Sequence, residues 1–233
     1  MAEKKKAMLL GDYTDAPWHP LEPARAELEA ILGEAFELTA TEDYDVLLRL
    51  QTEAGGYPLC IAYTDCWNRE LTKAQTAGLL RYVAGGGGLL VIHNGISLQC
   101  SYELLQMIGA EFTGHPPYQK LRYSRTAEGE GHPLLEGVED FELDEEPYLF
   151  EPDPFVERRI FLEFEFEGKR LPAGWEHDYG LGRVVYLQPG HHAPSFRPEP
   201  YRRLIRNSAS WAAAGRVVSG RERGGEAGGE PAG

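Results

Sequence analysis

The sequence predicts a single α/β domain built on a doubly wound sheet, with extra β structure in its second half. Strand-like and helix-like segments alternate through the first hundred residues, which is typical of a parallel sheet covered by helices. Residues 89–92 form an unbroken apolar run, as expected for a central strand that is buried on both faces. The second half is richer in strand-like segments, so we expect them to be inserted after the fourth strand.

The first half contains four predicted strands and the helices that connect them. The strands are expected at residues 7–11, 36–40, 59–63 and 89–92. A helix is expected at 20–32, where apolar residues recur along one stripe, and a short helix at 41–50. Thr72 and Gln75 form a capping box that starts another helix, and the glycines at 85–88 end it.

The second half is predicted to contain short strands between two helices. The helices are expected from Ser101 to residue 108 and at 200–214. The predicted strands are residues 121–126, 138–143, 148–150, 160–166 and 183–187. We therefore place one domain at residues 1–215. Residues 216–233 are rich in Gly, Glu and Arg and poor in apolar residues, so this tail is expected to be disordered.

Composition excludes several classes of partner. The chain carries a formal net charge of −14 over 233 residues. Nucleic acids and anionic membrane surfaces require local positive charge, so we expect neither as a partner. The apolar runs are too short for a secretory leader or a membrane span. The three cysteines fit no zinc motif, and we expect reduced thiols in a cytoplasmic protein.

Polar side chains follow several predicted strands at their carboxyl ends. Asp12 and Asp15 come after the first strand, His93 after strand 89–92, and His191 after the strand that ends at residue 187. In open α/β sheets, ligands bind just beyond the carboxyl ends of the strands. His93 and His191 could therefore open onto the same edge of the sheet.

Two further histidines, His115 and His132, precede prolines in predicted loops. Near neutral pH an imidazole can bind a metal, act as a general base or hydrogen-bond a sugar hydroxyl. Any one of these histidines alone is more often a structural loop residue, and His132 is the weakest candidate because such turns often use the ring to bind nearby backbone.

A set of short motifs, in this order along the chain, resembles the ThuA-like (trehalose utilisation) family. The motifs occupy residues 71–75, 82–83, 87–93, 109–116, 132–133, 144–148, 172–175, 180–186 and 190–191. The resemblance covers about residues 7–215. It implies a flavodoxin-like fold similar to class I glutamine amidotransferases. It also implies a role in the metabolism of trehalose and related disaccharides, where family members are linked to oxidised 3-keto-sugars.

The resemblance also shows what this chain lacks. Class I glutamine amidotransferases carry a nucleophilic cysteine on the sharp turn after the strand that corresponds to residues 89–92. Here the turn contains His93, Asn94 and Gly95, and Cys100 lies too far along the chain. Without a thiolate at this position, glutamine has no activated nucleophile. We therefore do not expect glutaminase activity.

The resemblance adds His115, Glu145 and Tyr148 to the candidate site. We predict His93, Glu145 and His191 as catalytic residues. Asp12, Asp15, Trp67, His115 and Tyr148 are predicted to bind substrate, although Trp67 and Tyr148 could equally be packing residues. His93, His115 and His191 could bind a divalent metal such as Zn, Mn or Fe, and the same groups without a metal could exchange protons beside a carbonyl.

Two functions remain open from the sequence. The first is an enzyme of carbohydrate metabolism, an isomerase or hydrolase that acts on a disaccharide or 3-keto-sugar by His/Glu acid–base chemistry. No Gly-x-Gly-x-x-Gly motif follows the first strand, so a separate sugar dehydrogenase would supply any nicotinamide-dependent step. The second is a non-catalytic module for sugar binding or assembly. A homodimer is expected from general frequency.

Overall fold

The computed structural model describes residues 3–51 and 56–215; the tail predicted at 216–233 lies outside this range. A nine-stranded sheet in the order β2-β1-β3-β4-β11-β10-β9-β6-β7 runs through the molecule. Its strands are β1 (Lys5–Gly11), β2 (Phe36–Thr41), β3 (Leu59–Tyr63), β4 (Gly88–Ile92), β6 (Gln119–Arg125), β7 (Phe141–Glu145), β9 (Arg159–Phe166), β10 (Lys169–Tyr179) and β11 (Gly182–Leu187).

The sheet has a parallel half and an antiparallel half. Strands β2, β1, β3, β4 and β11 pair in parallel, and the pairs from β11 through β10, β9 and β6 to β7 are antiparallel. Strands β5 (Ala110–Gly114) and β8 (Leu149–Pro152) form a separate antiparallel pair. This arrangement confirms the prediction of an α/β fold with extra β structure in the second half.

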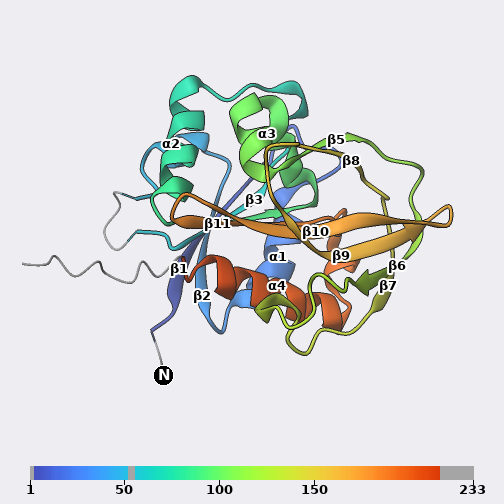
Figure 1. The fold of residues 1–233 in the computed structure, drawn as a ribbon. Helices are drawn as coiled ribbons and strands as arrows, with labels where there is room; N and C mark the ends of the chain where they lie inside the picture. The colour runs from blue at the N-terminus through green and yellow to red at the C-terminus, as the bar shows by residue number, and fades with distance from the viewer. Residues whose placement is uncertain (1–2, 52–55, 216–233) are drawn as a thin grey trace, which may run out of the picture.

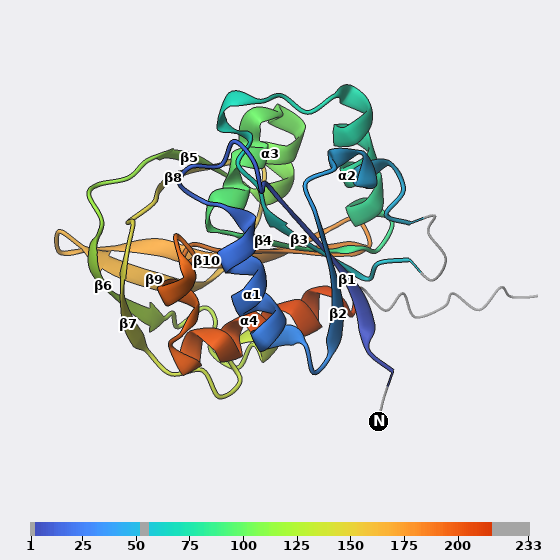
Figure 2. The same ribbon diagram turned by 180° about the vertical axis from the view of Figure 1, so that it is seen from behind.

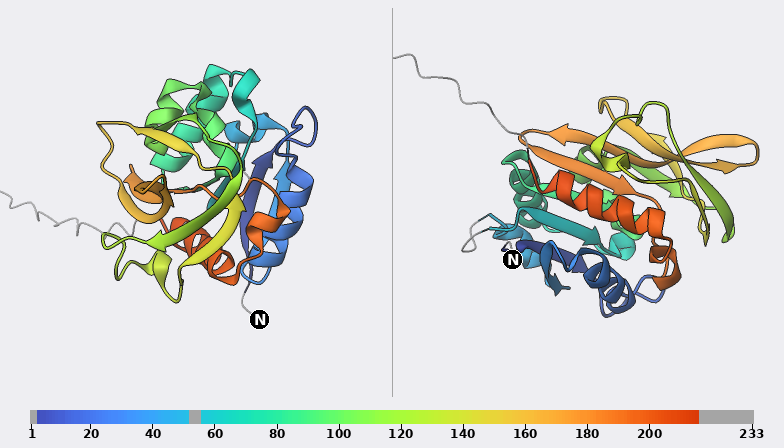
Figure 3. Two further views of the ribbon diagram at one scale, coloured as in Figure 1. Left: turned by 90° about the vertical axis from the view of Figure 1, so that its right-hand side faces the viewer. Right: turned by 90° about the horizontal axis from the view of Figure 1, so that it is seen from below.

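Helices cover both faces of the parallel half. Helices α1 (Leu21–Leu32) and α4 (Glu199–Ala212) pack on one face, and α2 (Lys73–Ala84) and α3 (Tyr102–Ile108) pack on the other (Figure 1). The reverse view and the view from below show α1 beside α4 on their shared face (Figures 2 and 3). None of the helices in the described ranges is long and apolar enough to span a bilayer.

The central strand β4 explains the unbroken apolar run of the sequence. Leu90 and Ile92 belong to the core beneath α1 and α4, whereas Leu89 and Val91 belong to the core beneath α2 and α3. Successive residues of a strand point to opposite faces, so a strand with helices on both sides must be apolar at every position. The carboxyl end of β4 is therefore held rigidly from both sides.

Several boundaries differ from the sequence-based expectation. The predicted helix at 41–50 is a 3₁₀ segment at Tyr44–Leu48, and the predicted strand at 148–150 pairs with β5 outside the main sheet. A 3₁₀ segment that was not expected runs from His93 to Cys100. The capping box of Thr72 and Gln75 is formed as predicted.

The parallel strands end at a crevice. Strand β1 leads into α1 on one face, whereas the neighbouring β3 leads into α2 on the other. Chain segments that leave adjacent strands in opposite directions open a crevice at the carboxyl ends of those strands. Residues that follow β1, β3, β4 and β11 converge there.

Candidate metal centre

His93 occupies a sharp turn directly after β4. Its φ angle is 47°, a left-handed conformation that is uncommon for a residue other than glycine. The turn packs tightly against Gly190, where an added Cβ would lie 2.9 Å from the Cβ of His93. A glycine at 190 thus allows the loop after β11 to approach the end of β4. The side chain presented by this turn is an imidazole.

Hydrogen bonding determines the tautomer of His93. Its ring is completely buried, and Nδ1 lies 2.8 Å from the carbonyl oxygen of Gln188. A carbonyl only accepts, so Nδ1 carries the proton and donates it. The buried Nε2 has no hydrogen-bond partner and presents a lone pair. A histidine oriented through one nitrogen with the other bare is the usual state of a metal ligand.

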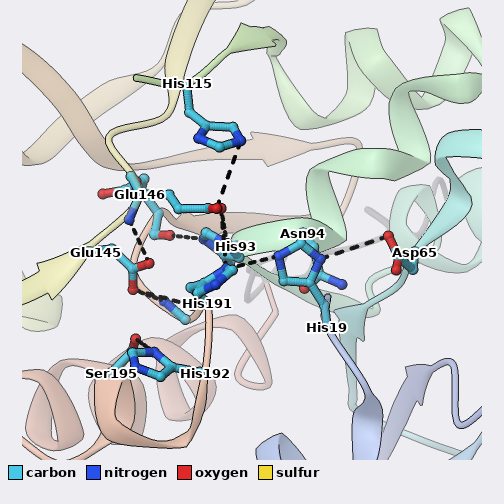
Figure 4. Close-up of polar contacts among 12 residues, drawn as sticks. His19, Asp65, His93, Asn94, His115, Glu145, Glu146, His191, His192 and Ser195 are labelled. Carbon is cyan, nitrogen blue, oxygen red and sulfur yellow. Dashed lines mark hydrogen bonds and ion pairs between the residues drawn. The ribbon is translucent and has the colours of Figure 1, made fainter. Parts of the chain in front are cut away.

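Three more side chains meet this nitrogen. The Nε2 atom of His93 lies 3.5 Å from Oε2 of Glu146, and Nδ1 of His191 lies 3.2 Å from the same oxygen. His19 approaches from the loop after β1, with Nε2 3.2 Å from Nδ1 of His191. Figure 4 shows these side chains pointing toward one another from separate segments. One ligand atom from each of the four residues lies within 4.8 Å of all the others.

Three of the six separations among these four atoms are close to those in a metal site. In a tetrahedron with metal–ligand bonds of about 2.1 Å, neighbouring ligand atoms lie about 3.4 Å apart. The three contacts above, at 3.2, 3.2 and 3.5 Å, fall close to this value. Three imidazoles and one carboxylate are suitable ligands for Zn, Mn or Fe. His19, His93, Glu146 and His191 therefore form a candidate metal centre.

The electrostatics of the centre favour a charged carboxylate among the imidazoles. Burial acts to raise the pKa of Glu146, but its contacts with His191 and His93 outweigh this effect, and the pKa lies well below its usual value. Burial acts to lower the pKa of His191, yet contact with Glu146 raises it overall. Burial dominates at His19, whose pKa is lowered despite its contact with Asp65. Glu146 is thus ionised, as a ligand must be.

Outer contacts orient the imidazoles. The Asp65 carboxylate, which follows β3, lies 3.8 Å from Nδ1 of His19, on the side of the ring away from His191. The Gln188 carbonyl accepts a direct hydrogen bond from Nδ1 of His93 at 2.8 Å. Carboxylates and carbonyls behind metal-binding histidines set the tautomer and raise the basicity of the ligand.

Glu145 points away from the histidines. It is fully buried, and its Oε2 accepts hydrogen bonds from the backbone N–H groups of Gly190 at 2.8 Å and His191 at 3.2 Å. These contacts hold the loop that presents His191. The carboxylate that faces the imidazoles is the next residue, Glu146, and a catalytic role for Glu145 stays a prediction.

His115 and Tyr148 lie at the rim of the centre. Nε2 of His115 is 3.8 Å from Oε1 of Glu146, and 39% of the His115 side chain is exposed. The Tyr148 ring stacks on His93 with a centroid distance of 4.2 Å and is buried. The three histidines that the sequence suggested as metal ligands, His93, His115 and His191, therefore lie near one another. His115 is not among the four residues of the candidate centre, whereas His19 is.

Asp12, Asp15 and Trp67 line a separate hollow beside the centre. This cavity has a volume of about 580 Å³ and also includes Trp18 and Asp65. The Asp65 carboxylate joins it to the centre through His19. The Asp12 carboxylate accepts a hydrogen bond from the Tyr44 hydroxyl at 2.8 Å and forms an ion pair with Arg69. Asp12 therefore stabilises the wall of this cavity. A cavity of this size can hold a small ligand.

A larger cavity, of about 1000 Å³, lies elsewhere and contains His132. Nε2 of His132 is 3.4 Å from Glu176, and its Nδ1 accepts a hydrogen bond from the backbone of Leu134. These contacts show a ring engaged with its own turn and with β10. His132 does not contribute to the candidate metal centre.

Comparison with known families matches residues 14–212 to the ThuA family, described as trehalose utilisation. The chain belongs to the ThuA family. Its fold resembles a putative ThuA-like protein from Parabacteroides merdae (TM-score 0.75, 15% identity, 95% of this chain and 94% of the other). A putative ThuA-like protein from Bacteroides uniformis is similar as well (TM-score 0.72, 19% identity, 91% and 93%).

The fold of this ThuA-family chain also occurs inside larger proteins. A β-galactosidase from Rahnella sp. R3 matches 94% of this chain over 32% of its own length, with a TM-score of 0.64 and 13% identity. Comparison with curated protein sequences found no match. The structural likenesses, at these identities, describe the fold.

Sequence reasoning did not identify two of the four candidate ligands, His19 and Glu146. His19 lies eight residues after β1, and its position between a strand and a helix was the available signal, because all such loops meet at one sheet edge. Glu146 is adjacent to the chosen Glu145. Glu145 is the last residue of β7 and Glu146 is the first residue beyond it, and only the tertiary fold shows which of the two side chains faces the histidines.

Proposed function

We propose that this chain is a metal-dependent enzyme of carbohydrate metabolism that acts on a disaccharide or 3-keto-sugar by acid–base chemistry. The proposal rests on one observation: three imidazole nitrogens and one carboxylate oxygen lie within 4.8 Å of one another at the carboxyl edge of the parallel strands. His19, His93, Glu146 and His191 would hold Zn, Mn or Fe. Such an ion polarises a carbonyl oxygen or lowers the pKa of a bound water.

His115 is the residue best placed to move a proton. Its Nδ1 lies 3.0 Å from the carbonyl oxygen of Pro116, so Nδ1 carries hydrogen and Nε2 keeps a lone pair. That lone pair faces Glu146 from the solvent side. A neutral imidazole in this position can accept a proton from a substrate held against the centre and return it later. Isomerisation and hydrolysis both require such a group.

The surroundings suit a sugar. Trp67, which is 38% exposed, and Phe112 pack together at a centroid distance of 5.1 Å, and Phe112 packs on Tyr148. Aromatic faces bind the apolar faces of sugar rings, and carboxylates such as Asp15 bind their hydroxyls. The adjoining cavity of about 580 Å³ gives room for a second ring. Membership of the trehalose-utilisation family supports a disaccharide or a keto-sugar derived from one.

Further parts of the proposal concern the setting of the reaction. The parallel strands follow the order β2-β1-β3-β4-β11, which corresponds to the flavodoxin-like order and supports a class I glutamine amidotransferase-like ancestry. A separate sugar dehydrogenase would carry out any oxidation. We propose that the protein acts in the cytoplasm, as a homodimer, with no nucleic-acid or membrane partner.

Metal analysis followed by turnover tests this proposal. Protein purified without chelator or affinity-tag metal should contain close to one equivalent of Zn, Mn or Fe, and His93→Ala should lose it. The loaded protein is then assayed with trehalose, other disaccharides and their 3-keto forms, using His115→Gln as the variant that keeps the metal and loses turnover. Absence of a stoichiometric metal from the wild-type protein would overturn the metal-dependent mechanism.

A second function is favoured by one observation. The same fold spans about a third of a β-galactosidase, so it can serve as one part of a larger assembly. On this alternative, the chain binds a sugar or a partner protein without catalysis. Metal and sugar binding without turnover of any tested disaccharide or keto-sugar would favour it over the enzyme.

A further inference from the structure

The cavity beside the metal centre carries an excess of negative charge. It has a volume of about 580 Å³ and is formed by the segments that follow β1, β2 and β3. Four carboxylates and one guanidinium line it, from Asp12, Asp15, Glu42, Asp65 and Arg69. Arg69 forms an ion pair with Asp12. The one positive charge is thus matched by one carboxylate, and the other three carboxylates line the cavity in excess.

The Asp65 carboxylate is nearly buried, and one of its oxygens has no hydrogen-bond donor. The side chain is 6% exposed, and its Oδ1 faces Nδ1 of His19 at 3.8 Å (Figure 4). Within residues 3–51 and 56–215, no group donates a hydrogen bond to Oδ2. Burying a carboxylate oxygen without a donor or a cation costs free energy. A cationic group in the cavity would therefore offset a cost that the protein alone leaves in place.

Two further carboxylates of the cavity are exposed. Oε2 of Glu42 accepts hydrogen bonds from the Thr14 hydroxyl at 3.0 Å and from the backbone N–H groups of Thr14 and Tyr13 at 3.1 Å each. These hydrogen bonds lower the pKa of Glu42, so this side chain is ionised at neutral pH. Asp15 is exposed as well. Both charges add to the negative potential that a ligand meets as it enters the cavity.

Two tryptophans line the same cavity with exposed rings. Trp18 is 74% exposed and Trp67 is 38% exposed. An aromatic face attracts a cation, and it also packs against the apolar face of a ring-shaped ligand. Asn68 lines the cavity too, and its amide can both donate and accept hydrogen bonds. Excess carboxylates together with exposed aromatic rings favour an organic cation over a neutral or anionic ligand.

We propose that this cavity binds a protonated amino sugar, which forms one unit of the substrate. Its ammonium group lies at Oδ2 of Asp65, and its hydroxyls donate to Asp15 and Glu42. Trp18 and Trp67 pack against the apolar face of the sugar ring. The volume of about 580 Å³ lies within the range of small-ligand sites.

The excess of carboxylates sets an order of affinity among sugars. A protonated amino sugar gains attraction from Asp15, Glu42 and Asp65. A neutral sugar makes the same ring contacts without that gain, and a sugar acid is repelled by the same three charges. The assignment of the ligand as a sugar rests on the proposed function, whereas the preference for a positive charge follows from the residues that line the cavity.

The test titrates the full chain, labelled with ¹⁵N, with glucosamine, glucose and glucuronate at constant ionic strength and slightly acidic pH. The chain contains four tryptophans, whose indole N–H signals report locally. Glucosamine should shift the signals of Trp18 and Trp67 in a saturable way and bind about tenfold or more tighter than glucose, with glucuronate weakest. Trp175, which is buried, and Trp211, which lines a different cavity, should not respond. Trp18→Phe and Trp67→Phe assign the two signals.

Two variants test the role of charge through the ratio of glucosamine to glucose affinity. Asp65→Asn should lower this ratio by about tenfold or more. Asp15→Asn changes an exposed residue that does not endanger folding, and should lower it by about two- to fivefold. Asp144→Asn is the matched control, because it makes the same chemical change at an exposed position of β7 outside the cavity, and should keep the full ratio.

Several results would overturn the proposal. They are equal binding of the three probes, tighter binding of glucose or glucuronate, no response of Trp18 and Trp67, and an unchanged ratio in both Asp65→Asn and Asp15→Asn. Metal content and turnover are measured separately, so a failure of the proposed function is distinguishable. Protein without metal that still prefers glucosamine would support the cavity assignment, and metal-loaded protein without the preference would refute it.

Discussion

Replacing Glu146 by glutamine tests the metal centre through protein stability. The substitution keeps the size of the side chain and removes the carboxylate that contacts His93 at 3.5 Å and His191 at 3.2 Å. A ligand that binds only the folded protein stabilises it by about 2.7 kcal/mol at a concentration of 100 times Kd. For a domain of this size, about 2–4 °C of Tm corresponds to each kcal/mol, so the expected rise is about 5–11 °C.

The variant should respond far less. Loss of a residue that contacts a metal ligand weakens metal binding by about 10–100-fold. Loss of a ligand itself should weaken metal binding by about 100-fold or more. At the same metal concentration a site weakened about 100-fold is half saturated, which leaves about 0.4 kcal/mol of stabilisation. The expected rise in Tm for Glu146→Gln is then about 1–2 °C.

Thermal melts of metal-free protein, with and without added Zn, Mn or Fe(II), measure both shifts. Glu151→Gln is the matched control, because it makes the same chemical change at an exposed position of β8 and should keep the full response. An equal shift in the wild-type protein and Glu146→Gln would refute the ligand assignment. No shift in the wild-type protein with any of the three metals would refute the centre itself.

Three further substitutions test other parts of the structure. Asp65→Asn removes the charge 3.8 Å from His19 and should weaken metal binding by about 10–100-fold in a competition titration; unchanged affinity contradicts the orienting role. Gly190→Ala places a Cβ 2.9 Å from the Cβ of His93. This variant should bind less metal, and its free energy of unfolding in urea titrations should be lower by about 1–3 kcal/mol. A variant with full metal content and unchanged stability would argue against the tight packing. Burial lowers the pKa of His177 from 6.5 to about 4. Between these two pH values the unfolded chain binds more protons than the folded protein. The free energy of unfolding should therefore fall by about 3 kcal/mol in all as the pH drops from 6.5 toward 4. His177→Gln keeps a donor for the Met107 carbonyl that Nε2 contacts at 2.8 Å and should flatten this pH dependence in urea titrations; an unchanged slope shows that other groups cause it.

Much of the parallel half could be predicted because its signals are local. An apolar run at 89–92 indicates a strand covered on both sides, and the capping box at Thr72 and Gln75 marks the start of α2. The antiparallel half was less predictable. Residues 141–145 and 149–152 are close in sequence but belong to different sheets, since pairing partners are chosen by contacts distant along the chain.

The sequence by itself determined which edge of the sheet carries the site. His93 and His191 follow buried strands, and the carboxyl ends of parallel strands open on one side whatever the details of packing. Only the tertiary structure decided the composition of the centre. Whether Glu145 or Glu146 faces the imidazoles depends on the rotation of the chain as it leaves β7, and His19 enters because the loop after β1 folds across the crevice. Each choice is set by hydrogen bonds from remote segments, including those from Gly190 and His191 to Glu145, which leave no pattern in the local sequence.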